Sequence, residues 1–148
     1  EDELANYRSK NVGIIFQSFN LLPSMTALEN VNLPNQISGA LIDDKKGIEL
    51  LKSVGLKNRL NHYPHQLSGG EQQRVAIARS LISSPEIIIA DEPTGNLDKR
   101  NSEEVMKLIF KLQSDFASTL ILVTHDETIA KQCNKIIKLD NGLIVKDE

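Results

Sequence analysis

The sequence predicts an α/β fold: a parallel sheet with a helical insertion after its first strand and a β-hairpin at its C-terminal end. Two apolar runs, EIIIA at 86–90 and TLILV at 119–123, have the length of strands and no polar alternation. Strands of this kind have both faces covered, which is typical of parallel sheets. The stretch between them has the apolar spacing of a helix, so the order is that of a strand–helix–strand unit.

The composition is that of one ordinary globular domain. The chain has 148 residues, 40% of them hydrophobic and 25% charged, and its formal net charge of -3 gives no basis for binding nucleic acid. The single cysteine, Cys133, excludes an internal disulfide framework and fits a reducing compartment. No apolar run approaches the about 20 residues that span a bilayer. The first residues, EDELANYR, are neither a signal peptide nor a natural start, so we expect a piece of a longer protein.

The first predicted strand is NVGIIF at 11–16, which is followed directly by Gln17. From 20 to 85 the pattern is helical. The expected boundaries of its first two helices are a capping box at Thr26 and Glu29, a limit at Pro34, an N-cap at Asp43 or Asp44, and a stop at Gly55.

The third helix of this block begins with two glycines, in the stretch LSGGEQQRVAIARSLI at 67–82. Ser68 is a suitable N-cap, and Glu71 completes a capping box. Apolar residues then recur at helical spacing: Val75, Ala76, Ala78, Leu81 and Ile82. Because glycine costs about 1 kcal/mol in a helix relative to alanine, two of them in a first turn need a reason. One interpretation is a capped helix with a flexible entry; the other is an anion site formed by bare backbone N–H groups at the positive helix end.

The remaining elements follow in the order strand, helix, strand, helix and hairpin. After the strand at 86–91, a helix beyond Asp98 places one apolar face toward the core: Val105, Leu108, Ile109, Leu112 and Phe116. A strand at 119–124 precedes a short helix after Asp126, and the pair Asn141-Gly142 predicts a type I′ hairpin within 135–147.

Polar residues follow three of the predicted strands: Gln17, the pair Asp91-Glu92, and His125. Each alone could be structural, as a strand-end cap, an N-cap or a loop histidine. Ligands bind beyond the carboxyl ends of open parallel sheets, so three such endings together indicate a site. Asp91 and Glu92 are adjacent and point to different sides. One carboxylate can therefore serve a hydrated magnesium ion, and the other can orient or deprotonate an attacking water.

Four stretches resemble the motifs of ABC ATPases, in that family's order and over essentially the whole chain. They are VGIIFQ (strand and Q-loop), LSGGEQQR (signature motif), IIIADEPTGNLD (Walker B strand, catalytic glutamate and D-loop) and TLILVTHD (switch histidine). FNLLPSMTALENVNLP and EPTGNLD further resemble the subgroup that powers lipoprotein release, macrolide export and peptide-antibiotic resistance. The resemblance implies a partial P-loop NTPase-type sheet, with 1–19 and 86–148 in the catalytic core and 20–85 as a helical subdomain.

The resemblance also implies a role for each candidate residue. In the family, the signature helix of one subunit caps the γ-phosphate of ATP held by the other subunit, which favours the anion-site interpretation of the two glycines, where a side chain would keep the phosphate away. The implied phosphate contacts are Ser68, Gly69, Gly70 and Gln72, while Asp98 would reach across the dimer interface. Asp91 would hold Mg²⁺ through water, Glu92 would be the general base, His125 would contact the γ-phosphate, and Gln17 would touch Mg²⁺ and the attacking water.

The implied partners are a second ATP-binding subunit, bound head to tail, and a transmembrane permease that faces the segment from Phe19 to about Gly39. ATP hydrolysis would be coupled to export or extraction of a lipoprotein, peptide or drug, on the cytoplasmic face of the membrane. Arg74 and Arg79 are interpreted as structural, pairing within the helical block. His62 and His65 are interpreted as loop residues and not as a zinc pair, since the single cysteine is distant.

One motif that this class of enzyme needs is absent. The loop G-x-x-x-x-G-K-[ST] cradles the phosphates, and the chain has no Gly-Lys pair. Since the family places this loop before the point where the chain begins, we expect an ABC ATPase domain truncated at its N-terminus and inactive alone. Two alternatives stay open: a non-transport ATPase of the same superfamily, and an interaction module without nucleotide. The compact block at 20–85 argues against the first, and magnesium-dependent ATPase activity would exclude the second.

Overall fold

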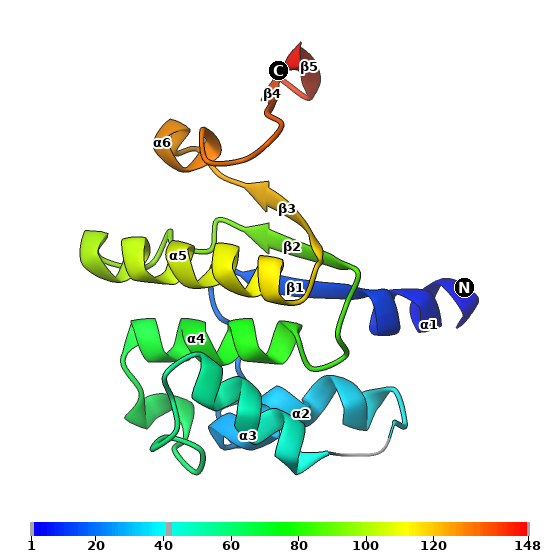
Figure 1. Ribbon diagram of the computed structural model, residues 1–148, viewed down its shortest axis with the longest axis vertical. Helices are drawn as coiled ribbons and strands as arrows, with labels where there is room; N and C mark the ends of the chain where they lie inside the picture. Colours follow the sequence, from blue (N-terminus) through cyan, green and yellow to red (C-terminus); the bar gives the residue numbers. More distant parts are fainter. Residues whose placement is uncertain (1, 41–42, 148) are drawn as a thin grey trace.

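A three-stranded parallel sheet forms the centre of the fold in the computed structural model, which describes residues 2–40 and 43–147. Its strands, in spatial order, are β1 (Val12–Phe16), β2 (Ile87–Asp91) and β3 (Thr119–Val123). A separate antiparallel hairpin of β4 (Ile137–Asp140) and β5 (Leu143–Asp147) lies beyond β3, away from the large helices (Figure 1). The predicted α/β class, the parallel sheet and the C-terminal hairpin are confirmed.

Most of the helices begin at the capping signals that the sequence contains. The helices are α1 (Asp2–Asn11), α2 (Ala27–Ile37), α3 (Asp44–Ser53), α4 (Gly69–Ser80), α5 (Lys99–Asp115) and α6 (Glu127–Ala130), with a short 3₁₀ helix at Pro64–Gln66. The side chains of Thr26, Asp43, Ser68, Asp98 and Asp126 all accept hydrogen bonds as N-caps. In the hairpin turn, Asn141 and Gly142 have φ of 48° and 79°, as a type I′ turn requires.

Two helical features differ from the prediction. The prediction that Pro34 limits its helix is wrong: Pro34 lies inside α2, which continues to Ile37. A proline in the last turn removes only one backbone bond, and the packing of the buried residues Ala27 and Val31 holds the helix in place. Helix α1 was not expected, because its sequence is mostly polar and its apolar residues Leu4 and Tyr7 are exposed.

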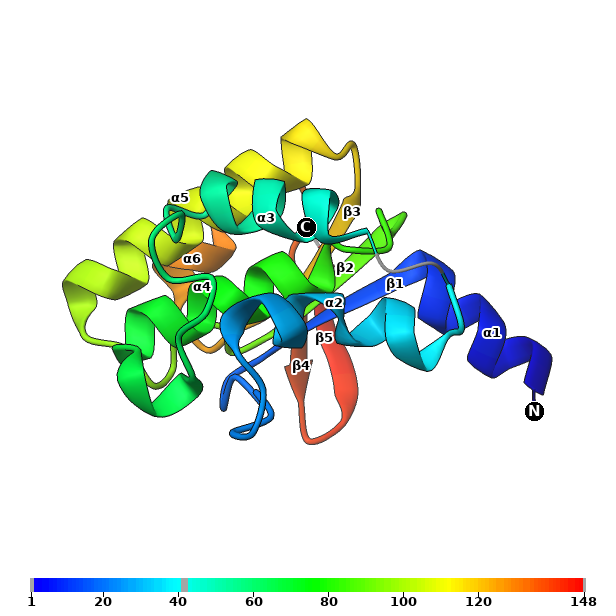
Figure 2. The ribbon, with the colours of Figure 1, turned by 90° about the horizontal axis from the view of Figure 1, so that it is seen from below.

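The core lies on one face of the sheet, where α4 packs between the strands and the pair α2 and α3 (Figures 1 and 2). Its fully buried side chains come from the sheet and from four helices: Ile15, Val31, Leu51, Val75, Ile77, Ile88, Val105 and Ile109. Residues 20–85 and the strands therefore share one hydrophobic core. Helix α4 is the central element of this core. Its position determines which of its side chains can reach the carboxyl edge of the sheet.

Strand β1 touches the end of α4 at Gly13. A Cβ atom at Gly13 would lie 2.1 Å from the carbonyl oxygen of Ser80, which belongs to the helix backbone and cannot rotate away. We expect Gly13→Ala to lower the free energy of unfolding by at least about 2 kcal/mol, since overpacking a core typically costs 1–3 kcal/mol. Urea denaturation measures the loss. Gly69→Ala is the control, because its Cβ would make an ordinary 3.6 Å contact with Leu97; equal losses in both variants would contradict the explanation.

The prediction that the strands at 86–91 and 119–124 are covered on both faces is wrong for β3, and β2 is only half-buried on its second face. On the face opposite the core, Ile14, Phe16, Ile121 and Val123 are 40%, 36%, 48% and 50% exposed. An apolar run shows that the side chains of a strand favour burial, but not that both faces are covered. The described helices pack on one face of the sheet only. An apolar sheet surface is therefore open to solvent within residues 2–40 and 43–147.

Strand β3 is also one of the two edge strands of the parallel sheet, and β1 is the other. An open apolar edge invites pairing with another chain, so we expect purified residues 1–148 to self-associate in a concentration-dependent manner. Ile121→Lys, which places a charge on the open face, should shift sedimentation toward the monomer. Ile37→Lys is the control, because Ile37 is 77% exposed on α2, away from the sheet. Equal effects of both substitutions would refute association through β3.

Candidate functional site

Three polar strand endings lie along one edge of the sheet. The parallel register aligns Phe16 with Asp91 and Asp91 with Val123, so the chain leaves all three strands at the same level. Gln17 follows β1, Glu92 follows β2, and His125 follows β3 after one further residue. The carboxyl edge thus gathers an amide, two carboxylates and an imidazole in neighbouring positions.

Glu92 and His125 are in direct contact. Glu92 Oε1 lies 2.7 Å from His125 Nδ1 and also accepts the backbone N–H of His125 at 2.9 Å. The backbone of Glu92 has φ of 43°, and its N–H donates to the carbonyl of Val123 at 3.0 Å. This left-handed turn aims the carboxylate at the end of β3. The hydrogen bond that Glu92 accepts from the His125 ring, together with the negative charge of Glu92, raises the pKa of His125 above the usual histidine value.

Gln17 is tied to the loop that follows β2. Its Nε2 donates to Asn96 Oδ1 at 3.4 Å, and Asn96 Nδ2 donates back to the carbonyl of Gln17 at 3.0 Å. The side chain also lies against Gly95, where a Cβ would come within 2.6 Å of Gln17 Nε2. These contacts engage the amide nitrogen of Gln17 and leave its oxygen as the group that can act as a ligand.

Asp91 ends β2 with an exposed carboxylate. The described ranges contain no group of three His, Cys, Asp or Glu side chains placed to hold a metal ion. Mg²⁺ prefers oxygen ligands and keeps several of its waters. One carboxylate and one amide oxygen therefore suit Mg²⁺, whereas a metal that takes all its ligands from the protein would need more. His65 lies in the 3₁₀ helix and stacks on Tyr63, with ring centroids 5.9 Å apart.

The N-terminus of α4 carries the capping box that the sequence predicts. Ser68 Oγ accepts the N–H of Glu71 at 3.2 Å, and Glu71 Oε2 accepts the N–H of Ser68 at 2.8 Å. The hydrogen bond from the N–H of Ser68 lowers the pKa of Glu71. Arg59, in a 3.0 Å ion pair with Glu71, lowers it further. Glu71 is therefore a charged structural group, while Ser68 and Gly69 are exposed at the positive end of the helix.

The two glycines of α4 have different surroundings. A Cβ at Gly69 would find ordinary contacts only, whereas a Cβ at Gly70 would lie 2.8 Å from Asn101 Oδ1. Gly70 is also buried, so a side chain there would have to displace the side chain of Asn101 in the first turn of α5. Gly69 is the position that has bare backbone at the surface. The two glycines thus differ in role: Gly70 packs closely against α5, and Gly69 exposes its backbone at the helix end.

Gln72 and Asp98, the other candidate phosphate and interface residues, make contacts within the chain. Gln72 Nε2 donates to the carbonyl of Leu67 at 3.1 Å. Asp98 caps α5 by accepting the N–H and the side-chain amide of Asn101, and the N–H of Asn101 lowers the pKa of Asp98. Asp98 is nevertheless exposed, with its carboxylate held in one orientation at the start of α5.

Arg74 pairs outside the helical block. Its guanidinium reaches Glu104 of α5 at 2.8 Å as well as the carbonyl of Val54, so the predicted pairing within 20–85 is only partly right. Arg79 donates to the carbonyls of Phe19 and Asn20, at the entry to the block.

Sequence reasoning missed two residues near the edge of the sheet, Asn96 and Gln73. Gln73 had a detectable signal, because it shares a helical face with buried residues at positions 76, 77 and 80 and is itself fully buried. A polar side chain in such an apolar stripe indicates a specific hydrogen-bonding task. Asn96 lies in a loop and offers no comparable pattern.

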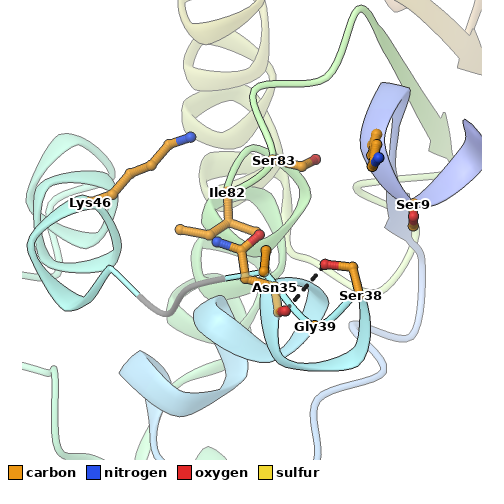
Figure 3. Close-up of a pocket in the computed structure, with 9 residues that line it drawn as sticks. Ser9, Asn35, Ser38, Gly39, Lys46, Ile82 and Ser83 are labelled. Atoms are coloured by element: carbon orange, nitrogen blue, oxygen red, sulfur yellow. Dashed lines mark hydrogen bonds between the residues drawn. The ribbon is translucent and has the colours of Figure 1, made fainter. Parts of the chain in front are cut away.

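A hollow of about 470 Å³ lies at the opposite end of the sheet, and its lining residues are drawn in Figure 3. Ser9 and Lys10 precede β1, and Ile82 and Ser83 precede β2, so the hollow is at the amino ends of these strands. Ligands of open parallel sheets bind at the carboxyl ends. The candidate site is therefore the edge with Gln17, Asp91, Glu92 and His125, and not this hollow.

Comparisons with known proteins agree with the motifs. A family profile described as "ABC transporter" matches residues 2–95. The macrolide export ATP-binding/permease protein MacB of Bdellovibrio bacteriovorus is 50% identical over 148 residues, which are 100% of this chain and 23% of that protein. The lipoprotein-releasing system ATP-binding protein LolD of Bacteroides fragilis is 46% identical over 147 residues, 98% of this chain and 68% of that protein.

A solved structure has the same fold. It is described as a dimeric, post-hydrolysis state of the ATP-binding cassette MJ0796 bound to ADP and Pi, and it matches with a TM-score of 0.86 and 44% identity. The match covers 100% of this chain and 66% of the cassette, so the chain spans about two thirds of its length. The profile covers more than half of the chain, and nearly the whole chain aligns with these three relatives at 44% to 50% identity. The chain therefore belongs to the ABC transporter family.

Proposed function

We propose that this chain is the larger part of an ATP-binding subunit that couples hydrolysis of ATP to transport by a membrane permease. The observation that carries the proposal is the 2.7 Å contact between Glu92 and His125, beside Asp91 at the carboxyl edge of the sheet. A carboxylate oriented by an imidazole, next to a second carboxylate that can serve a metal, is suited to activating water against a phosphate.

Glu92 is the general base in this proposal. Its Oε1 is held by His125, which leaves Oε2 to accept the proton of an attacking water. Protonated His125, whose pKa is raised by Glu92, supplies positive charge toward the terminal phosphate. Asp91 and the side-chain oxygen of Gln17 are the groups that would hold Mg²⁺. When bound, that ion neutralises charge developing on the phosphate oxygens.

The N-terminus of α4 binds the phosphate of ATP held by a second, head-to-tail copy. Ser68 offers a hydroxyl and Gly69 a backbone N–H at the positive end of the helix, where anions are stabilised. Gly70 and Gln72 shape this end, and Asp98 at the start of α5 faces the second copy. The dimeric description of the solved cassette, with ADP and Pi, supports this arrangement.

The transport assignment rests on the relatives. The relatives are named for lipoprotein release and macrolide export. The cargo in this proposal is a lipoprotein, a peptide or a drug. None of the described helices has both the length and the apolarity to cross a bilayer. A permease would hold the ATP-binding part at the inner face of the membrane, through residues 19–39. In this division 1–19 and 86–148 form the catalytic part, and 20–85 the helical part.

The test is magnesium-dependent ATPase activity of the complete gene product that contains residues 1–148. We expect hydrolysis that EDTA abolishes and that its permease alters in proteoliposomes. Residues 1–148 alone, which lack the phosphate loop, serve as the inactive control. Absence of hydrolysis in the complete product would favour an interaction module, and hydrolysis with no associated permease would favour a non-transport ATPase.

A further inference from the structure

Two side chains of α4 hold the backbone on either side of Gln17. After Gln17, Arg79 Nη2 donates to the carbonyl of Phe19 at 2.7 Å and Nη1 to that of Asn20 at 2.6 Å. Before Gln17, Gln73 Nε2 donates to the carbonyl of Phe16 at 3.5 Å. The loop that carries Gln17 is thus attached at both ends to one helix.

The segment held by Arg79 has an unfavourable backbone conformation. Phe19 and Asn20 have φ of 60° and 50°, in the left-handed region that side chains disfavour. Such a conformation persists only where its surroundings impose it. The half-buried guanidinium of Arg79, with its planar fork of donors, meets both carbonyls of this turn at once. Burial lowers the pKa of Arg79 from its usual high value.

Gln73 connects the same helix to the other catalytic strand ending. Besides Phe16, its Nε2 donates to the carbonyl of Pro93 at 2.6 Å, and Pro93 directly follows Glu92. Gln73 is fully buried, and its Oε1 has no hydrogen-bond partner among the described residues. A buried oxygen without a partner destabilises the fold. We therefore attribute the presence of Gln73 to the two hydrogen bonds that its Nε2 donates. Those contacts span the gap between the ends of β1 and β2.

The loop that carries Gln17 also reaches the opposite, N-terminal end of α4. The ring of Phe19 reaches this end, where a Cβ built on Gly69 would lie 3.9 Å from Phe19 Cζ. We propose that Arg79 and Gln73 are positioning residues that make α4, the Gln17 loop and the Glu92 turn move as one unit. A shift of Ser68 and Gly69 on phosphate would then reposition Gln17 and Glu92. This inference rests on the proposed function.

Arg79→Met, made in the complete gene product, is the main test because it removes both donors and keeps an unbranched apolar stem. Arg79→Lys should give an intermediate result, since an ammonium cannot reproduce the planar fork. Gln73→Met tests the second tether. Arg74→Met is the matched control: it lies on the same helix and is also half-buried, but it donates to Val54 and Glu104 instead of the loop.

Two measurements separate positioning from general stabilisation. In hydrogen exchange, Arg79→Met should accelerate amides 18–22 by at least about 10-fold while the core of α4 keeps its protection. In steady-state kinetics, kcat should fall about 10- to 100-fold because the catalytic groups are misplaced, with KM for ATP changing less than about 2-fold.

Each outcome decides a separate point. Local acceleration with a loss of kcat, absent in Arg74→Met, supports the inference. Unchanged exchange at 18–22, or the same change in Arg74→Met, refutes the tether. Local acceleration with unchanged kcat refutes the coupling. If the unsubstituted gene product does not hydrolyse ATP, the proposed function fails, and the exchange measurement alone still decides whether Arg79 holds the loop.

Discussion

Glu92→Gln is expected to reduce ATP hydrolysis by the complete gene product about 10²- to 10⁴-fold, the usual contribution of a general base. Glutamine keeps the shape of the side chain and its contact with the N–H of His125, but it cannot accept the proton of water. ATP affinity should stay unchanged, because the carboxylate of Glu92 does not donate hydrogen bonds to the phosphates of ATP. Single-turnover hydrolysis and equilibrium binding of ATP separate the two effects.

The control for this substitution is Glu86→Gln, which removes an exposed carboxylate near the opposite end of the same strand. It should leave kcat unchanged. If Glu92→Gln hydrolysed ATP within a few-fold of the unsubstituted protein, the base would have to be reassigned, with His125 as the next candidate.

The same substitution has an effect on titration that does not depend on turnover. Since Glu92 raises the pKa of His125, Glu92→Gln should lower that pKa toward the ordinary histidine value. Because the folded pKa is the higher one, the pair stabilises the fold below the ordinary histidine pKa and loses this contribution as pH rises through the raised value. NMR titration of His125 in the two proteins measures the shift.

The second large effect is expected from Ser68→Arg, which should prevent formation of the ATP-bound dimer. An arginine at this exposed N-cap places bulk and positive charge where the helix end would meet the partner's phosphate. ATP binding to each monomer should persist, since the helix end acts on the other copy's nucleotide. Size-exclusion chromatography with light scattering, in the Glu92→Gln background and saturating ATP, measures the dimer.

The substitution also removes a helix cap, which costs about 1 kcal/mol. Thr26→Arg is therefore the control, because it removes the capping-box residue of α2 in the same way. We expect the Thr26 variant to dimerise and the Ser68 variant to remain monomeric. Equal dimer content in Ser68→Arg and the unsubstituted protein would refute the head-to-tail arrangement.

Local signals predicted the element order well, for reasons that lie within a few residues of each helix or turn. The capping boxes at Thr26 and Ser68 are formed by side chains three residues apart, and the turn at Asn141-Gly142 depends on two adjacent φ angles. The edge position of Gln17, Glu92 and His125 follows from parallel strands, whose carboxyl ends share one side. These features required no knowledge of the packing.

What the sequence determined by itself is the family, the order of elements and the strand endings that carry the candidate chemistry. Only the tertiary structure decided that Gly70 packs against Asn101 of α5, that Pro34 stays inside α2, and that one face of the sheet is open within the described residues. It also decided that Arg79 and Gln73 reach the loop around Gln17, across 57 to 60 positions of sequence. The physical reason is that caps and turns are satisfied within a few residues, whereas close packing and long hydrogen bonds join atoms that only the folded chain brings together.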